Sequence, residues 1–218
     1  TLNAICMVSY NYFYFKGTQI GFAGVGGVLV TTLNPTLTAL ISGLFFGGML
    51  NKKDWLGLFL GLLSGGLIIQ VWKLDLVQLL NSGNIYFLLA SLSWVCVTII
   101  TSQAKDHIPF ITYSFWSFTL SFLISIPLAY TESLFIVFSF DWVFWLNMAF
   151  LAVAAMSFGT SIYFLASVEL GPKRASAYIF TVPITAMIFA VYFLNEPIAI
   201  TTLLGGALGV LAVYLINK

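Results

Sequence analysis

Residues 31–68 read TTLNPTLTALISGLFFGGMLNKKDWLGLFLGLLSGGLI, and residues 179–216 read IFTVPITAMIFAVYFLNEPIAITTLLGGALGVLAVYLI. Placed over one another at an offset of 148 residues, the two stretches align three pairs that act on backbone geometry: Pro35 with Pro183, Gly57 with Gly205, and Gly61 with Gly209. Proline and glycine matches are more informative than matches of Leu, because they restrict or free the backbone in addition to setting hydropathy. The pattern predicts an internal repeat.

The composition indicates that this chain lies in a lipid membrane. Of 218 residues, 61% are hydrophobic and only 7% are charged, which is not the composition of a water-soluble domain. A helix needs about 20 apolar residues to cross a hydrocarbon core of about 30 Å. Charged and turn residues divide the chain into eight such segments, near 1–16, 22–49, 54–73, 84–104, 108–130, 141–168, 174–194 and 199–217. Their apolar periodicity is helical, so we expect an all-α, polytopic bundle of about eight transmembrane helices.

The basic residues predict how these helices are oriented. One set of short loops, together with the C-terminus, carries six of the eight basic residues: Lys52, Lys53, Lys105, Lys173, Arg174 and Lys218. The opposite set carries only Lys16 and Lys73. By the positive-inside rule, the first set and the C-terminus face the cytoplasm. We therefore expect a multi-pass protein of the inner (plasma) membrane.

The two copies of the repeat begin five spans apart, so they cross the membrane in opposite directions. Such an inverted repeat is typical of secondary transporters that work by alternating access. We assign residues 1–73 to a partial first repeat with its last three helices, and residues 84–218 to a second repeat of five helices. Two spans precede the repeated unit only in the second copy. We therefore expect two N-terminal helices to be absent from this sequence; a protein of eight spans is the alternative.

Several short motifs in the second copy carry a family resemblance: Tyr163-Phe164 with Ala166, Gly171-Pro172 with Ala175 to Ala177, Thr181-Val182-Pro183, Leu194-Asn195-Glu196-Pro197, and Gly205 with Gly209. On these residues the chain resembles an EamA-type transporter of the drug/metabolite transporter superfamily. The resemblance implies ten helices in two inverted five-helix repeats, both termini in the cytoplasm, and a central cavity that moves small organic molecules. It does not identify the substrate.

The matched prolines indicate where a substrate site would lie. Pro35 and Pro183 each fall near the middle of a span and remove a backbone hydrogen bond where no water can replace it. Matched discontinuities in two halves of a transporter point to a site at the membrane midplane, although a kink relieved by nearby Thr hydroxyls is an equally open interpretation. Polar stripes at helical spacing add the candidate substrate-binding residues: Tyr12, Thr31, Asn34, Trp94, Ser157, Tyr178, Thr181 and Thr185. For Trp94, a packing role remains the alternative.

The remaining reactive residues give little support to other functions. Cys6 and Cys96 are single thiols without metal-ligand spacing, and His107 is the only histidine, so we expect no enzyme activity, no metal site and no cofactor. A net charge of +1 without a basic face excludes a nucleic-acid partner. No span interior carries an ionisable residue, and Glu196 at a span end is either a solvated carboxylate or a proton or cation site.

Small residues recur at the GxxxG spacing that lets helices approach closely, at Gly43 and Gly47, Gly57 and Gly61, Gly61 and Gly65, and Gly205 and Gly209. Packing within the bundle accounts for them, and a homodimer is a further possibility. The expected partners are therefore the lipid bilayer and a small-molecule substrate. We predict a secondary transporter of small polar or amphipathic, amino-acid-like metabolites, with export as the expected direction. The alternative is a non-transporting scaffold or lipid-handling subunit with the same bundle.

Overall fold

The computed structural model describes residues 1–20, 23–46, 50–68, 70–73, 84–104, 107–129, 134–183 and 200–218, and individually Thr185, Ile188 and Tyr192. All regular secondary structure in these ranges is helical, which confirms the predicted all-α class.

Seven of the eight predicted spans correspond to described helical segments, and the 174–194 span is described only in its first part. The first part of the chain forms α1 (Leu2–Ile20), α2 (Ala23–Phe46), α3 (Lys52–Ile68) and the 3₁₀ turn η1 (Val71–Lys73). The second part forms α5 (Asn84–Gln103), α6 (Phe110–Ala129), the 3₁₀ segment η2 (Leu134–Ser139), α7 (Trp142–Phe150), the π-helical segment η3 (Leu151–Gly159), α8 (Thr160–Leu170), α9 (Pro172–Ala177), the 3₁₀ turn η4 (Tyr178–Thr181) and α11 (Ile200–Asn217). The segments α7, η3 and α8 follow one another without a break.

Four helical stretches in the described residues are long and apolar enough to cross a bilayer: Gly26–Leu44, Ile85–Gln103, Phe110–Leu128 and Trp142–Leu170. The stretch Leu203–Asn217 is apolar but shorter. The helix α3 has 17 residues, and most of the predicted 174–194 span beyond Pro183 lies outside the described residues. These findings support a multi-pass helical bundle, and the number of eight spans stays a prediction.

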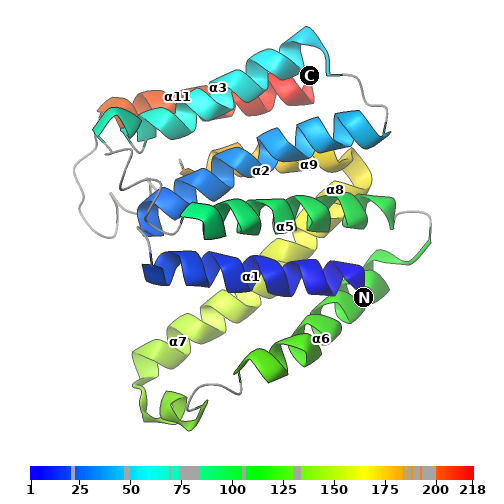
Figure 1. The fold of residues 1–218 in the computed structure, drawn as a ribbon, viewed down its shortest axis with the longest axis vertical. Helices are drawn as coiled ribbons and strands as arrows, with labels where there is room; N and C mark the ends of the chain where they lie inside the picture. Colours follow the sequence, from blue (N-terminus) through cyan, green and yellow to red (C-terminus); the bar gives the residue numbers. More distant parts are fainter. Residues whose placement is uncertain are drawn as a thin grey trace.

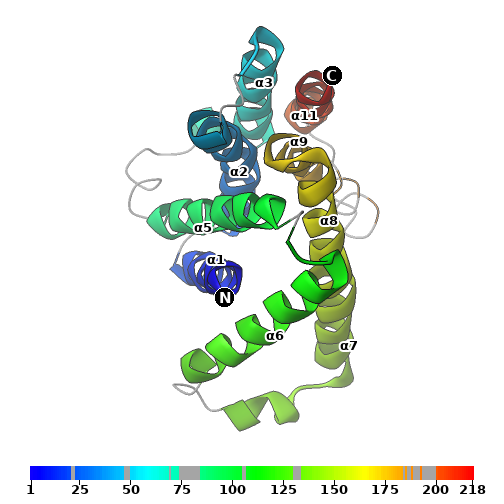
Figure 2. The ribbon, with the colours of Figure 1, turned by 90° about the vertical axis from the view of Figure 1, so that its right-hand side faces the viewer.

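The helices pack as neighbours that are distant in sequence. In Figure 1, α3 lies along α11, and α2 lies between this pair and α5. The helix α1 packs against both α5 and α6, while α8 crosses α5 and leads into α9. One apolar core cluster joins α2, α3, η4 and α11 around Phe180, Ala39 and Leu58, and another joins α1, α2 and α5 around Phe87 and Val30. Figure 2 shows α6 and α7 spreading apart at the opposite end of the molecule from α3 and α11.

The contact between α3 and α11 is reciprocal. A Cβ atom added at Gly57 would lie 2.7 Å from the Ile216 side chain and 3.1 Å from the Ala212 carbonyl oxygen. A Cβ atom added at Gly205 would lie 2.6 Å from the Ile68 side chain and 2.8 Å from the Ser64 carbonyl oxygen. Gly57 and Gly205, Ser64 and Ala212, and Ile68 and Ile216 are all related by the offset of 148 residues. Each helix therefore presents the same groove and the same ridge to the other.

The same glycine pairs were predicted to permit close packing or a homodimer. Gly61 and Gly65 face Phe180 and Thr32 of the same chain, so these two positions are used within the bundle. Gly47 lies outside the described residues. Dimerisation stays a prediction.

A sharp turn separates α8 from α9. Gly171 has φ +80° and ψ 163°, a backbone conformation that only glycine adopts readily. Pro172 then occupies the first position of α9, where its missing N–H costs no helical hydrogen bond. The Gly171-Pro172 motif therefore ends one helix and sets the direction of the next.

The two matched prolines lie in different local structures. Pro35 lies inside α2, a continuous α-helix of 24 residues. Pro183 follows a segment that is broken into the six-residue α9 and the 3₁₀ turn η4. There the backbone N–H of Val182 donates to the Ile179 carbonyl, which is the group that Pro183 cannot bond. The shorter 3₁₀ bond thus satisfies a carbonyl that an α-helix would have left open.

Candidate functional site

A cavity of about 540 Å³ lies between the two sequence halves. Its walls come from α1, α2, α5, η3, α8 and the segment around η4: Tyr10, Tyr14, Gly27, Val28, Val30, Thr31, Asn34, Trp94, Ala155, Gly159, Thr160, Tyr163, Ile179, Val182 and Pro183. None of these lining residues is ionisable at neutral pH. The volume is within the range of about 300–1,000 Å³ typical of small-molecule sites.

Four aromatic side chains form a row along one wall, which we call the aromatic row: Tyr14, Tyr10, Trp94 and Tyr163. The ring centroids are 5.8 Å apart between Tyr14 and Tyr10, 4.7 Å between Tyr10 and Trp94, and 5.4 Å between Trp94 and Tyr163. The Tyr163 hydroxyl shares a 2.8 Å hydrogen bond with Thr98, whose hydroxyl also donates to the Trp94 carbonyl. These bonds hold the row in place, so its ring faces form a fixed apolar surface with polar edges.

Asn34 is the polar group that stands out in this cavity. Its side chain is only 3% exposed, and its Oδ1 atom has no hydrogen-bond partner in the described part of the chain. A buried amide oxygen without a partner costs about 1–3 kcal/mol. A ligand whose N–H or O–H group donates a hydrogen bond to the Asn34 Oδ1 atom would recover that cost. Asn34 is therefore suited to binding a hydrogen-bond donor of a bound molecule.

The structure brings four of the predicted residues to the cavity wall: Thr31, Asn34, Trp94 and Pro183. Pro35, next to Asn34 in the chain, is fully buried within α2 and does not line the cavity. The role of these residues in substrate binding stays a prediction.

The other five predicted binding residues lie away from the cavity wall. Tyr12 and Ser157 are exposed, on helix faces that do not line it. Tyr178 is 48% exposed, and the Thr181 and Thr185 hydroxyls donate to the nearby carbonyls of Tyr178 and Val182. The predicted stripe on this segment therefore has its hydroxyls occupied by its own backbone, with none of its members at the cavity.

Sequence reasoning missed much of the aromatic row. Tyr10 and Tyr14 share a helix with Tyr12 but lie on the opposite face, and their i, i+4 spacing is the signal that could have found them. On the other side, the segment η3 is π-helical, and Ala155 and Gly159 line the cavity instead of Ser157. A π-helix has wider turns than an α-helix, so the α-helical spacing used for Ser157 does not apply there.

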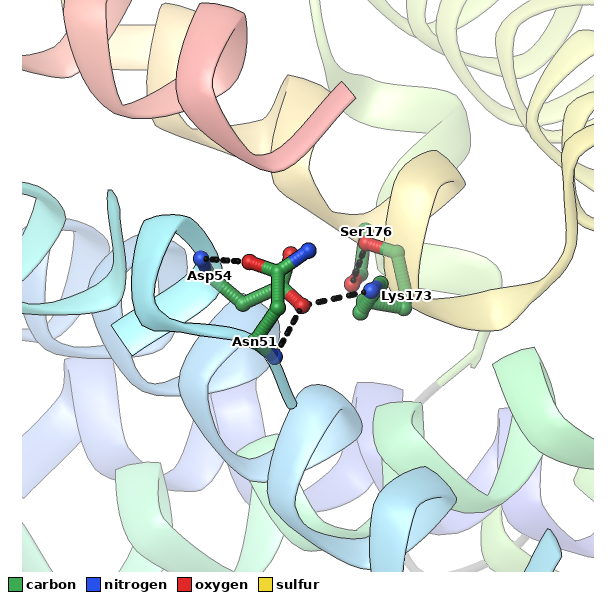
Figure 3. Close-up of polar contacts among 4 residues, drawn as sticks. All are labelled: Asn51, Asp54, Lys173 and Ser176. Atoms are coloured by element: carbon green, nitrogen blue, oxygen red, sulfur yellow. Dashed lines mark hydrogen bonds and ion pairs between the residues drawn. The ribbon is translucent and has the colours of Figure 1, made fainter. Parts of the chain in front are cut away.

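The sequence analysis also missed a charged cluster at the start of α3, the helix that follows α2 (Figure 3). Asp54 in the first turn of α3 is 2% exposed, and its Oδ2 atom accepts a 2.9 Å bond from the Lys173 Nζ atom in α9. Asn51 forms a reciprocal cap with Asp54: the Asn51 N–H donates to the Asp54 carboxylate, and the Asp54 N–H donates to the Asn51 side chain. Lys173, which the sequence analysis used only to predict membrane orientation, is therefore also an ion-pair partner. Glu196 lies outside the described residues.

Comparison with known proteins identifies the family. Residues 81–218 match the model of the EamA-like transporter family, which is more than half of the chain. The chain belongs to the EamA-like transporter family. This membership confirms the resemblance drawn from the sequence motifs.

Three relatives of this EamA-like transporter illustrate the similarity. A protein named as an uncharacterized transporter in Synechocystis is 26% identical over 94% of the chain and 66% of the relative. The uncharacterized transporter YdfC of Bacillus subtilis is 27% identical over 93% of the chain and 66% of the relative. A chloroplastic WAT1-related protein of Arabidopsis thaliana is 25% identical over 94% of the chain and 51% of the relative. The chain thus spans between half and two thirds of the length of these relatives.

Proposed function

We propose that this chain acts as a secondary transporter that exports small polar or amphipathic, amino-acid-like metabolites across the inner membrane by alternating access. The observation that carries the proposal is the uncharged cavity of about 540 Å³, whose wall contains both the aromatic row and the unpartnered Asn34 amide. Aromatic faces and one hydrogen-bonding amide suit molecules with an apolar part and a donor group.

The chemistry of the wall narrows the substrate class. Tyr and Trp rings accept both apolar groups and ammonium groups over their faces. The Asn34 Oδ1 atom accepts an N–H or O–H group. No charged side chain lines the cavity, so a molecule with a large net charge would not be compensated there. A neutral or zwitterionic organic molecule fits these conditions best.

Two observations support alternating access. The reciprocal α3–α11 contacts join positions related by the 148-residue offset, as expected for a repeat of residues 1–73 and 84–218 about a pseudo-two-fold axis. The cavity takes its walls from both of these ranges, which is where two rocking halves would hold a substrate. In this proposal the C-terminus and the loops that contain Asp54 and Lys173 face the cytoplasm.

The proposal is tested by untargeted metabolite analysis of spent medium from cells that overproduce the intact protein, the Asn34→Ala variant or the Asn147→Ala variant at equal membrane levels. Asn147 is an exposed asparagine of α7 outside the cavity, so it is a matched control. We expect a compound to accumulate with the intact protein and with Asn147→Ala, and to fall with Asn34→Ala. Equal media from all three strains and the empty-vector strain would count against export.

The direction is tested separately with the compound so identified. Right-side-out and inside-out vesicles are loaded or bathed with it, and its movement is followed in each. Faster uptake into inside-out vesicles corresponds to export from the cell. Preferential uptake into right-side-out vesicles would replace export by import and leave the cavity assignment in place.

A further inference from the structure

The Asp54–Lys173 ion pair lies at the end of the bundle away from the cavity. The part of α2 that lines the cavity ends at Asn34, whereas the pair lies beyond the last residue of α2, Phe46. Along the other chain segment, Lys173 precedes Pro183 by ten residues, which is about 15 Å at the rise of a helix. The pair therefore connects the start of α3, the helix that follows α2, to the start of α9.

Along α2 and the α9–η4 segment, buried apolar residues stand between the cavity-lining positions and the end of the bundle that carries the ion pair. Ala39 of α2 packs in one buried cluster with Ala177 and Phe180 of the α9–η4 segment and with Leu58 of α3. Ser176, one turn from Lys173, is completely buried. Buried small and aromatic side chains therefore follow the ion pair along α3 and the α9–η4 segment, and Figure 3 shows the pair between the starts of α3 and α9.

The two charged groups are held in place by their own helices. The cap with Asn51 fixes the Asp54 carboxylate at the start of α3. The Gly171-Pro172 turn fixes the start of α9, so the position of Lys173 depends on the direction of that helix. A change in the tilt of α9 relative to α3 would therefore separate the Nζ and Oδ2 atoms.

Asp54 is much more buried than Lys173, and we take this difference as typical of a contact that forms and breaks. The Asp54 side chain is 2% exposed and the Lys173 side chain is 29% exposed, so the carboxylate is shielded while the lysine side chain is partly accessible. A buried carboxylate is costly without its partner, but separation of α9 from α3 would admit water to both groups. The ion pair then stabilises the arrangement in which this end is closed and contributes nothing to one in which it is open.

We propose that the Asp54–Lys173 ion pair is a latch that holds this end of the cavity closed and breaks each time the cavity opens toward it. The latch rests on the proposed function, because it presupposes a cavity that opens alternately to the two sides. It adds a residue-level account of which contact must be lost for the opening on the side predicted to be cytoplasmic.

The latch is tested by the reactivity of a buried cysteine at Ser176. Ser176→Cys is nearly isosteric, and the two native cysteines are removed as Cys6→Ala and Cys96→Ala. Inside-out membrane vesicles are treated with a membrane-impermeant maleimide, without any substrate. We expect slow labelling of the reporter in the otherwise intact chain, and labelling about tenfold faster or more in the neutral pair Asp54→Asn with Lys173→Gln.

Three further variants separate a latch from a helix cap. Asp54→Asn alone keeps an oxygen that can accept from the Asn51 N–H, so the cap is preserved while the charge is lost. Lys173→Arg keeps the ion pair and should keep the reporter protected. Lys53→Gln, an exposed charge of the same turn, is the matched control and should also keep it protected.

The outcomes discriminate clearly. Labelling of the neutral pair at the rate of the intact chain would overturn the latch. Faster labelling in an added variant, Asp54→Ala, without faster labelling in Asp54→Asn would also overturn it, because that result describes loss of the cap. If the neutral pair does not accumulate in the membrane while Lys173→Arg does, the pair is needed for folding and the latch is also overturned. If the protein exports a compound but the cysteine at position 176 is labelled at the same rate in all variants, only the latch is overturned. If labelling is faster in the neutral pair but no variant transports a compound, only the proposed function is overturned.

Discussion

The two proline segments share a sequence pattern but differ in structure. Around Pro35, α2 is a continuous helix with its polar side chains Thr32, Asn34 and Thr38 buried. Before Pro183, the chain forms the short helix α9 and the 3₁₀ turn η4, and Tyr178 faces outward. The difference shows that the packing of neighbouring helices determines which of the two polar helix faces lines the cavity. The helix α2 is packed by α3, α5 and α9, so its stripe is enclosed.

The residues at equivalent positions also differ in size. Thr32 in α2 corresponds to Phe180 in η4 at the offset of 148 residues. Thr32 sits against Gly65 of α3, whereas the Phe180 ring is inserted against Gly61 and into the apolar cluster with Ala39 and Leu58, and the Phe180 carbonyl lies against Gly209. In the described part of the second proline segment, Phe180 is thus the large buried side chain, beside the small buried residues Ala175, Ser176 and Ala177.

The largest expected effect comes from the loss of this buried side chain. Phe180→Ala removes a side chain that is 1% exposed and should destabilise the protein by about 3–5 kcal/mol. Thr32→Ala removes a hydroxyl that bonds the Val28 and Leu29 carbonyls and should cost about 1 kcal/mol. Thermal unfolding of both variants in the same detergent measures the difference. Equal shifts in Tm would mean that the two segments are attached in the same way.

A smaller effect is expected for the prolines, on flux rather than on stability. Pro183→Ala supplies an N–H that can compete for the Ile179 carbonyl and convert the 3₁₀ turn into α-helix, which would rotate Ile179 and Val182 at the cavity wall. Pro35→Ala restores a hydrogen bond within a helix that is already continuous. We expect Pro183→Ala to lower flux of the exported compound several-fold more than Pro35→Ala.

This comparison requires equal amounts of each variant in the membrane, measured by quantitative immunoblotting. Unchanged flux in Pro183→Ala at normal abundance would show that this proline shapes the fold without affecting transport.

The smallest effect is expected on the outward-facing stripe. Thr181→Val removes a hydroxyl that bonds only the Tyr178 carbonyl, so stability should change by less than about 0.5 kcal/mol and flux should stay the same. Thr31→Val, at the cavity wall, should lower flux. Initial rates for both variants provide the measurement. A loss with Thr181→Val as large as that with Thr31→Val would restore the predicted binding role of the second stripe.

Sequence reasoning succeeded where the signal was local. Apolar length and the positions of charged residues predicted the described helices to within a few residues, except for the 174–194 span, most of which lies outside the described residues beyond Pro183. Spacing along α2 predicted that Thr31 and Asn34 share a face. It failed where packing decided the result. The choice between the Tyr10 and Tyr12 faces of α1 depends on α5, and the π-helical turns around Ser157 leave no clear trace in the residue pattern. The Asp54–Lys173 pair joins residues 119 positions apart, which no helical spacing reveals.

The reciprocal seam between α3 and α11 has a consequence for how the sequence can vary. The Ile216 side chain packs against Gly57, and the Ile68 side chain packs against Gly205. Each helix therefore contributes one isoleucine and one glycine to the same kind of contact. A bulkier residue in place of either glycine requires a smaller residue in place of the isoleucine that packs against it on the opposite helix, as at the interface of a homodimer. Among related sequences, these four positions should therefore covary in crossed pairs, Gly57 with Ile216 and Gly205 with Ile68, even though each pair is separated by more than a hundred residues.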